Sequence, residues 1–363
     1  MKAVTTVLIL FLLTQSFQAQ FSPYADSLIK AGIRQIYSIQ FDKAYRTFDI
    51  LKEKYPQNPA GDFFNAMVLW WQILLDLHET RFDDLFYQKL ENVIEQCDKI
   101  LDENPNDYFG LFFKVGALGF RGRLLSVREK WLDAALDGKD ALSLVYRIYE
   151  LYPDDKDINL GLGLYNYYSD VIPKFYPFVE PLMYLFPKGN RELGLKQLTF
   201  VADSGRYAKY ETRYFLLQAY YNFEKDNDKA LYYCNELLRD FPDNPKFENF
   251  LGRIYLRTRK FMKADSVFRS IYNKIQTEKR GYNTPTNERS DYYYLGALAY
   301  RMFKDKEAID FFERSLEISE ELDGDDYSGF MKNTYKYLIK LYNRNNNKKK
   351  AKYYSELLKE RFG

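Results

Sequence analysis

Apolar residues recur at three- and four-residue spacing along most of this chain of 363 residues, with polar residues between them. That period places the apolar side chains on one face of a helix, and no segment sustains the alternation that predicts a β-strand. We therefore expect an all-α protein. Small residues mark a repeat within the pattern, and in the C-terminal half they stand at Ala230, Ala264, Ala308 and Ala351.

Each of these alanines follows an apolar and aromatic helix, such as Leu251-Gly252-x-x-Tyr255, and Ala264 is followed by Phe268. The pattern W-x-x-L-G-x-x-Y followed by A-x-x-x-F belongs to the tetratricopeptide repeat (TPR) family, which the chain resembles at these positions. The resemblance implies units of two antiparallel helices, in which the small residue lets the helices approach closely. Because one unit cannot bury its apolar face alone, the units stack into a right-handed solenoid.

The N-terminal half follows the same plan with longer units. Its small positions are Ala44, Val93, Ala141 and Gly194, which stand 48 to 53 residues apart, against 34 residues between Ala230 and Ala264. We predict about eight TPR-like units: one regular unit at about 25–58, three expanded units up to about 205, and four nearly standard units between 211 and 363. The chain then divides into residues 20–205 with expanded units and residues 206–363 with regular units.

The fourth unit contains a segment unlike its surroundings, VIPKFYPFVEPLMYLFPKGN at residues 171–190, with four prolines and five aromatic residues. Because the prolines forbid one long helix, we expect an insertion over 167–190, between a first helix ending near Tyr168 and a second beginning near Asn190. The insertion is interpreted as a strap of short helical turns packed on the solenoid. The alternatives are a cover for a partner groove and a membrane-surface contact.

The residues on both sides of this insertion carry a second resemblance. With GLGLYNYY before it and PKGNRELGLKQL after it, the stretch 160–198 resembles the matching region of the eukaryotic TPR proteins linked to inclusion-body clearance and the mitochondrial outer membrane. That resemblance implies a strapped TPR architecture without enzymatic activity.

Residues 1–19 have the layout of a secretory signal peptide. Lys2 precedes an uncharged run from Ala3 to Leu13, and a more polar stretch leads to Ala19. The run is shorter than the roughly 20 residues of a membrane-spanning helix, so we expect cleavage after Ala19 and export in preference to a permanent anchor. In a Gram-negative bacterium the destination is the periplasm or the outer membrane.

Charge and composition narrow the function further. With 53 Lys and Arg against 51 Asp and Glu, the net charge is only +2, so no global field attracts nucleic acid and we expect no nucleic-acid partner. The run from Asn345 to Lys350 is accordingly interpreted as an exposed turn. His78 is the only histidine, which excludes a multi-histidine metal site, and we expect it in a loop or at a helix end.

Other residues with chemical potential also have structural explanations. The Gly161-Leu162-Gly163 string lacks the third glycine and the preceding strand of a dinucleotide-binding turn. Cys97 and Cys234 fall at the same core position of units three repeats apart, beyond disulfide reach, so we expect two buried free thiols. We predict no catalytic residue, no cofactor and no metal, and therefore no enzyme.

Binding is the better prospect. In TPR proteins the first helix of each unit lines a concave groove, and seven of the twenty groove positions in the last four units are Lys or Arg, while none is acidic. Cations with asparagine and aromatic neighbours suit an acidic peptide or a chain-terminal carboxylate, although a solvated helix face is the alternative. The predicted peptide-groove residues are Asn222, Lys246, Asn249, Arg253, Arg257, Tyr293, Tyr300, Arg301, Asn333, Lys336, Lys340 and Arg344.

These observations together predict an exported, non-catalytic TPR scaffold or adaptor that binds a protein or an extended acidic peptide in its concave groove. The first alternative is a membrane-surface or lipid-associated TPR protein that makes contact through residues 171–187. A second alternative is a protein that binds a glycan or small ligand through its many tyrosines, although core packing already accounts for most of them.

Overall fold

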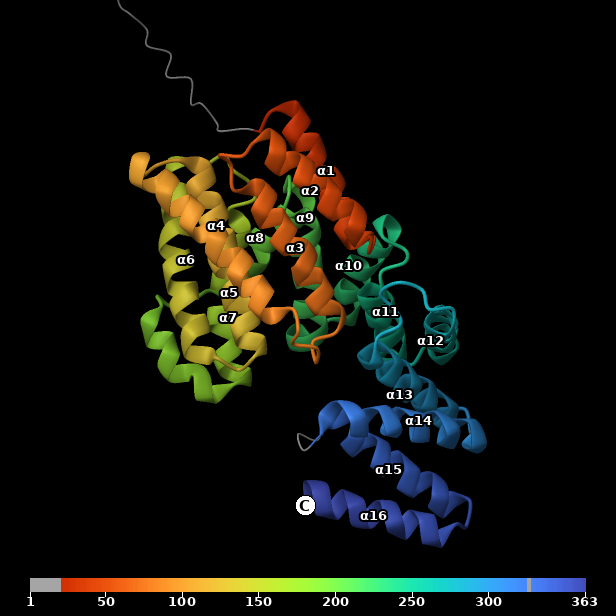
Figure 1. Ribbon diagram of the computed structural model, residues 1–363. Coiled ribbons are helices and arrows are strands. Elements are labelled where there is room, and N and C mark those ends of the chain that lie inside the picture. The colour runs from red at the N-terminus through yellow and green to blue at the C-terminus, as the bar shows by residue number, and fades with distance from the viewer. Residues whose placement is uncertain (1–20, 325–327) are drawn as a thin grey trace, which may run out of the picture.

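A computed structural model describes residues 21–324 and 328–363, and within them sixteen α-helices form eight antiparallel hairpins (Figure 1). This part of the chain contains no β-strand. The predicted all-α repeat fold with about eight units is therefore confirmed.

Four hairpins make up the N-terminal part of the chain. They are α1 (Pro23–Tyr37) with α2 (Phe41–Lys54), α3 (Ala60–Leu75) with α4 (Asp83–Glu103), α5 (Tyr108–Val127) with α6 (Trp131–Leu151), and α7 (Asn159–Phe175) with α8 (Arg191–Ser204). Helices α4, α5 and α6 exceed the length of a standard repeat helix, which accounts for part of the wide spacing of the small residues.

The C-terminal hairpins are more regular. They are α9 (Lys209–Gln218) with α10 (Asn227–Asp240), α11 (Pro245–Arg257) with α12 (Phe261–Gln276), α13 (Pro285–Arg301) with α14 (Asp305–Asp323), and α15 (Gly329–Arg344) with α16 (Lys348–Phe362). Helix α9 continues into a π-helical turn, η2 (Ala219–Glu224), before α10 begins.

The small residues of the repeat bring the two helices of a hairpin together. Ala44, Ala264 and Ala308 are fully buried. A Cβ atom on Gly252 would lie 2.6 Å from the ring of Phe268, so only glycine allows the ring this position. The pattern of small residues therefore sets the packing distance within each hairpin, as the sequence predicts.

The proline-rich insertion differs in its bounds from the prediction. Helix α7 ends at Phe175, beyond Tyr168, so Pro173 lies inside its last turn, where it supplies no N–H donor and the helix ends two residues later. The chain then forms a 3₁₀ segment, η1 (Pro177–Leu185), which contacts α6 and α7. Val179 is buried there, whereas Phe178 and Tyr184 are 60% and 90% exposed.

The first hairpins curl back onto the fifth and sixth, so that the N-terminal part of the solenoid closes into a compact body (Figure 1). The ring of Tyr37 at the end of α1 packs against Trp71 of α3 and against Phe241 and Phe247, which flank the start of α11. One hydrophobic core extends from Ala25 to Ile254. Helices α12 to α16 have separate cores and extend from the body as an arm.

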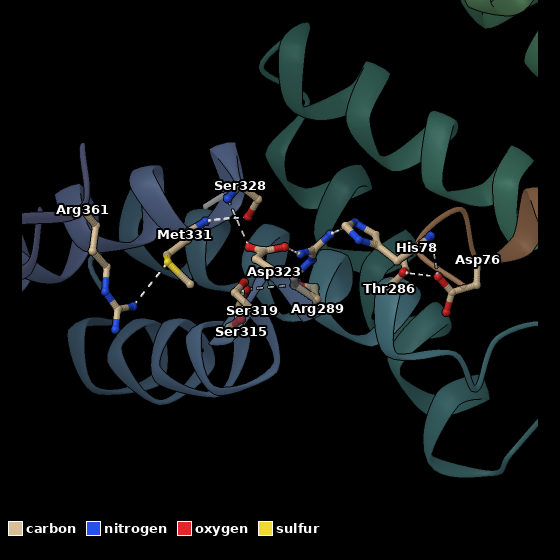
Figure 2. A network of polar contacts seen from close by, with 10 residues as sticks. All are labelled: Asp76, His78, Thr286, Arg289, Ser315, Ser319, Asp323, Ser328, Met331 and Arg361. Carbon is tan, nitrogen blue, oxygen red and sulfur yellow. Dashed lines mark hydrogen bonds and ion pairs between the residues drawn. The ribbon is translucent and has the colours of Figure 1, made fainter. Parts of the chain in front are cut away.

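A turn between α3 and α4 joins the body to the arm, as Figure 2 shows. Thr286 donates a 2.5 Å hydrogen bond to Oδ1 of Asp76, and Nη2 of Arg289 donates to Nε2 of His78 at 2.9 Å. Arg289 also forms a buried ion pair with Asp323 at 2.5 Å. His78 therefore lies in a turn, as predicted, and contributes to the attachment of the arm.

Both cysteines are buried free thiols, as the repeat register predicts. Burial raises the pKa of the Cys97 thiol to about 12, and it also raises the pKa of Cys234, whose Sγ donates to the carbonyl oxygen of Phe247. Neither thiol is activated as a nucleophile.

Candidate functional site

A cavity of about 570 Å³ opens where the arm leaves the body, beside α11, η2 and α13. Four of its lining residues are the arginines Arg253, Arg257, Arg259 and Arg301. The other four are aromatic or apolar: Tyr221, Leu256, Phe261 and Tyr294. No lining residue is Asp or Glu. Three of the four arginines are predicted groove residues, so the structure brings Arg253, Arg257 and Arg301 together at one site.

Helix α11 carries Arg253 and Arg257, and the turn that follows it carries Arg259. Asn244 caps the helix, and its side chain also donates a 2.9 Å hydrogen bond to the carbonyl oxygen of Tyr37, which fixes α11 on the body. Arg253 and Arg257 are one turn apart and share a face of the helix. Arg259 follows the helix with a left-handed φ of 59°, in the turn that leads into α12.

The ring of Tyr221 contacts the guanidinium groups of Arg253 and Arg257. The guanidinium of Arg257 lies 3.4 Å from the centroid of the Tyr221 ring, and its Nη1 donates to the carbonyl oxygen of Tyr221 at 2.6 Å. The guanidinium of Arg253 lies 4.7 Å from the same ring, and its Nε is buried without a hydrogen-bond partner. Both contacts are cation–π interactions that hold the arginines in place without neutralising them.

Arg301 approaches from α13. Its Nη1 donates to the carbonyl oxygen of Ala297 at 3.1 Å and to the hydroxyl of Tyr337 at 3.2 Å. Across residues 21–324 and 328–363, none of the four cavity arginines forms an ion pair with a carboxylate. The cavity therefore carries four guanidinium groups without a carboxylate partner in the described chain, and those of Arg257, Arg259 and Arg301 are exposed to solvent.

Further groove residues lie along the arm on α15. Asn333, Lys336 and Lys340 are exposed there. Arg344 differs, because its Nε donates to Oδ2 of Asp305 at 2.6 Å and its guanidinium lies over Tyr300. It therefore joins the last two hairpins.

Tyr293 and Tyr300 also pack within the arm. Tyr293 meets Phe330 with ring centroids 5.1 Å apart, and Tyr300 meets Tyr337 at the same separation. Both rings are partly buried. These contacts explain the two tyrosines by the packing of α13 against α15.

The groove is closed at the fifth hairpin, in contrast to the open surface expected from the repeat register. Thr212 and Phe215 of α9 and Ala219 at the start of η2 stand at groove positions but are buried, because the body closes over this hairpin. Asn222 lies in the π-helical turn η2, where its carbonyl oxygen accepts a hydrogen bond from Lys225. The open part of the predicted groove begins at α11.

Two predicted groove residues line the closed end of α11. Asn249 donates a 3.1 Å hydrogen bond to the hydroxyl of Ser290. Burial and the neighbouring charge of Arg253 lower the pKa of Lys246 to about 8, although Asp76 acts in the opposite direction. Lys246 is therefore a cation whose charge changes slightly above neutral pH.

Sequence reasoning missed Arg259, Tyr221, Phe261 and Tyr294. The aromatic residues follow the apolar repeat pattern, so they are indistinguishable from core residues in the sequence. Arg259 could have been predicted from the sequence, because it follows Arg257 by two residues and extends the same run of cations.

The described part of the chain contains neither a metal-binding cluster nor a membrane-spanning helix. No group of three His, Cys, Asp or Glu side chains in that part of the chain is arranged to hold a metal ion. Among the described helices, none combines the length and the apolar character needed to cross a membrane.

Comparison with known proteins gives likeness at the level of helical repeats. No family model matches the sequence, and no curated protein matches it. Among solved structures, the C-terminal part of a TPR repeat-containing protein from Cytophaga hutchinsonii is similar, with 15% identity, a TM-score of 0.30, and coverage of 92% of this chain and 93% of that chain.

Two other similar structures contain ligands. A monomeric mutant of IFIT1 with Gppp-AAAA has 14% identity and a TM-score of 0.45, over 89% of this chain and 68% of that chain. NprR in complex with its cognate peptide NprX has 12% identity and a TM-score of 0.39, over 92% of this chain and 87% of that chain. The chain is thus similar to TPR-repeat proteins, and at these scores the likeness bears on no function.

Proposed function

We propose that this chain is an exported, non-catalytic scaffold that binds an acidic segment of another protein, or an extended acidic peptide, along its arm. The observation that carries the proposal is the cavity with four arginines and no carboxylate. A guanidinium group grips a carboxylate with two parallel hydrogen bonds, so an acidic side chain is the complement of this site.

The charge of the last hairpin, α15 with α16, supports the same partner. Residues 329–363 contain ten Lys and Arg but only two Asp and Glu, whereas the whole chain has a net charge of +2. Lys336 and Lys340 are exposed on α15 and form no ion pair within the described chain. Such a local excess of positive charge speeds the encounter with an acidic partner and favours it over a basic one.

The proposed location rests on the sequence at the N-terminus. The predicted signal peptide at residues 1–19 lies outside the described residues, and its layout is the support for export. In a Gram-negative bacterium the scaffold would act in the periplasm or at the outer membrane.

Binding of a labelled decaglutamate peptide to the mature chain tests the proposal. The test variant combines Arg253→Glu, Arg257→Glu and Arg301→Glu, and the control combines Lys43→Glu, Lys99→Glu and Lys139→Glu at exposed lysines on the body. Both variants change the net charge equally. We expect the arginine variant to lose at least about tenfold in affinity and the control to lose much less.

Circular dichroism and thermal melting establish that both variants remain folded. Equal losses in the two variants would show that only the net charge matters, and the cavity would then have no role. Absence of binding by the parent chain at low salt would refute the proposal as a whole.

A second candidate function rests on the exposed aromatic residues of the insertion. Phe178 and Tyr184 are 60% and 90% exposed, and Phe175 and Tyr176 of the same segment are also exposed. Aromatic side chains favour the interface between membrane and water, so this surface suits a contact with lipid through residues 171–187. Vesicle sedimentation tests it, because Phe178→Ser with Tyr184→Ser should abolish lipid binding and leave peptide binding intact.

A further inference from the structure

The cavity on the arm carries more positive charge than a single carboxylate requires. Arg253, Arg257, Arg259 and Arg301 give it four guanidinium groups, and its lining includes no acidic residue. We infer that the cavity is a site for a phosphoryl group carried by an organic ligand. The inference rests on the proposed function, since it defines the ligand class of the same site.

Two of the arginines are held in position while most of their donors remain available. Arg257 uses Nη1 on the carbonyl oxygen of Tyr221, and Arg301 uses Nη1 on Ala297 and Tyr337. A guanidinium has five N–H donors in a planar fork, so each group keeps several for a ligand. The site is therefore preorganised, and binding loses little side-chain entropy.

Arg253 is the most deeply placed of the four cations. Its Nε is buried and has no hydrogen-bond partner, and its guanidinium stacks 4.7 Å from Tyr221 and 5.0 Å from Phe250. Arg253 is partly buried, and no carboxylate of the described chain pairs with its guanidinium group. An anion in the cavity would compensate this charge, so the free protein holds the arginine in a state that favours an anionic ligand.

The charge and shape of a phosphoryl group match the cavity better than those of a carboxylate. A phosphomonoester has a charge of about −1.5 to −2 at pH 7 and three acceptor oxygens, whereas a carboxylate has one charge and two oxygens. Several guanidinium forks can share three oxygens, each with paired hydrogen bonds. A monoanion would leave most of the positive charge of the cavity uncompensated.

The apolar and aromatic lining of the cavity indicates the chemistry of the rest of the ligand. Leu256, Phe261 and Tyr294 line the cavity with apolar and aromatic surface beside the arginines. A flat ring attached to the phosphoryl group can stack on these walls, with a gain beyond that of simple burial. The ligand class is therefore a phosphomonoester of an aromatic or apolar group, such as a phosphorylated side chain of a partner protein.

Calorimetric titration with four small probes tests this inference on the mature chain. Phenyl phosphate has both the aromatic ring and the phosphoryl group, whereas inorganic phosphate lacks the ring. Phenyl sulfate has the ring with a single negative charge, and benzoate has the ring with a carboxylate. We expect phenyl phosphate to bind at least about tenfold more tightly than benzoate or phenyl sulfate. Its affinity should also rise between pH 5 and pH 7, because the second ionisation of a phosphomonoester has a pKa of about 6.

Variants locate the binding. Arg253→Gln with Arg257→Gln should remove most of the preference for phenyl phosphate, whereas Arg257→Lys, which keeps the charge but loses the fork, should retain part of it. Lys99→Gln with Lys139→Gln, at two exposed lysines on the body, is the control that removes the same charge. Melting curves confirm that each variant is folded before its affinity is compared.

The outcomes separate this inference from the proposed function. If benzoate and decaglutamate bind as well as phenyl phosphate or better, the cavity is a carboxylate site and only this inference fails. If phenyl phosphate binds equally to the parent and to the double arginine variant, the inference also fails. If neither phosphorylated nor carboxylated probes bind, both proposals are refuted.

Discussion

Tyr37 at the end of α1 donates a 2.6 Å hydrogen bond to Oε2 of Glu211 in α9, which lies 174 residues later in the chain. Nη1 of Arg123 in α5 forms an ion pair with the other carboxylate oxygen, also at 2.6 Å. Glu211 is buried, so its two partners supply the hydrogen bonds that water cannot. One carboxylate thereby links the first, third and fifth hairpins and closes the body.

Replacement of this carboxylate should loosen the body. In Glu211→Leu, Arg123 remains between Trp70 and Phe215 without its anion, and we expect the free energy of unfolding to fall by about 3–5 kcal/mol. Tyr37→Phe removes only one hydrogen bond to the carboxylate and should cost about 1.5–3 kcal/mol. Urea denaturation followed by circular dichroism measures both, and equal stability of Glu211→Leu and the parent would contradict this account.

Local features of the fold are predictable from the sequence because they depend on neighbouring residues. The spacing of Ala264 and Phe268 predicts a hairpin, since helical period and small-residue packing act within one repeat unit. The buried free thiols follow from the same register. The end of α7 is less predictable, because the helix continues through Pro173 for two more residues.

Closure of the body could not be predicted in this way. It depends on contacts such as Asn244 with Tyr37, which are far apart in the sequence and follow from the accumulated curvature of several units. The candidate site combines features that the local repeat predicts with features that depend on closure of the body. Three of its four arginines stand at groove positions defined by the repeat, whereas the burial of Phe215 and the position of Tyr221 follow from closure and from the π-helical turn.

Two glycines should respond oppositely to alanine. A Cβ atom on Gly252 would lie 2.6 Å from the ring of Phe268, so Gly252→Ala should destabilise the protein by about 1–3 kcal/mol. Gly119 lies in α5 with no atom within 4 Å of the same position, so Gly119→Ala should stabilise by about 0.5–1 kcal/mol through helix propensity. Melting temperatures that shift in the same direction for both variants would disprove this packing argument.

Asp291 in α13 is a buried carboxyl whose two oxygens have no hydrogen-bond partner. Burial, assisted by the charge of Glu288, raises its pKa well above the ordinary value. Because the folded state keeps a proton that the unfolded state releases above pH 4, this residue makes stability fall as pH rises from about 4 toward its raised pKa.

Asp291→Asn should remove this effect. The variant should therefore gain stability relative to the parent as the pH increases from 4 to 7, by about 1–3 kcal/mol at pH 7. Asp310→Asn, at an exposed position of α14, is the matched control and should show no such trend. A constant difference between Asp291→Asn and the parent across this pH range would mean that the carboxyl is already ionised in the folded protein.

The junction of body and arm should depend more on its buried ion pair than on its histidine. Asp323→Ala leaves Arg289 buried without an anion and should lower the free energy of unfolding of the arm by about 3–5 kcal/mol. His78→Gln retains a side-chain acceptor and should cost less than about 1 kcal/mol. Hydrogen exchange of α13 measures both, and faster exchange in His78→Gln than in Asp323→Ala would reverse this order.

Lys246 should make peptide binding dependent on pH just above neutrality. Its pKa is lowered to about 8, so it is charged at pH 7 and largely neutral at pH 9, and it shares the face of α11 that leads to Arg253. The affinity for decaglutamate should therefore fall by about two- to fivefold over this range, and Lys246→Gln should bind more weakly at pH 7 without that decline.

Deprotonation of Lys246 cannot weaken binding by unfolding the protein. The unfolded lysine, with a pKa near 10.4, binds more protons than the folded one at pH 9, so stability rises there as binding weakens. A pH profile unchanged by Lys246→Gln would assign the effect to another group.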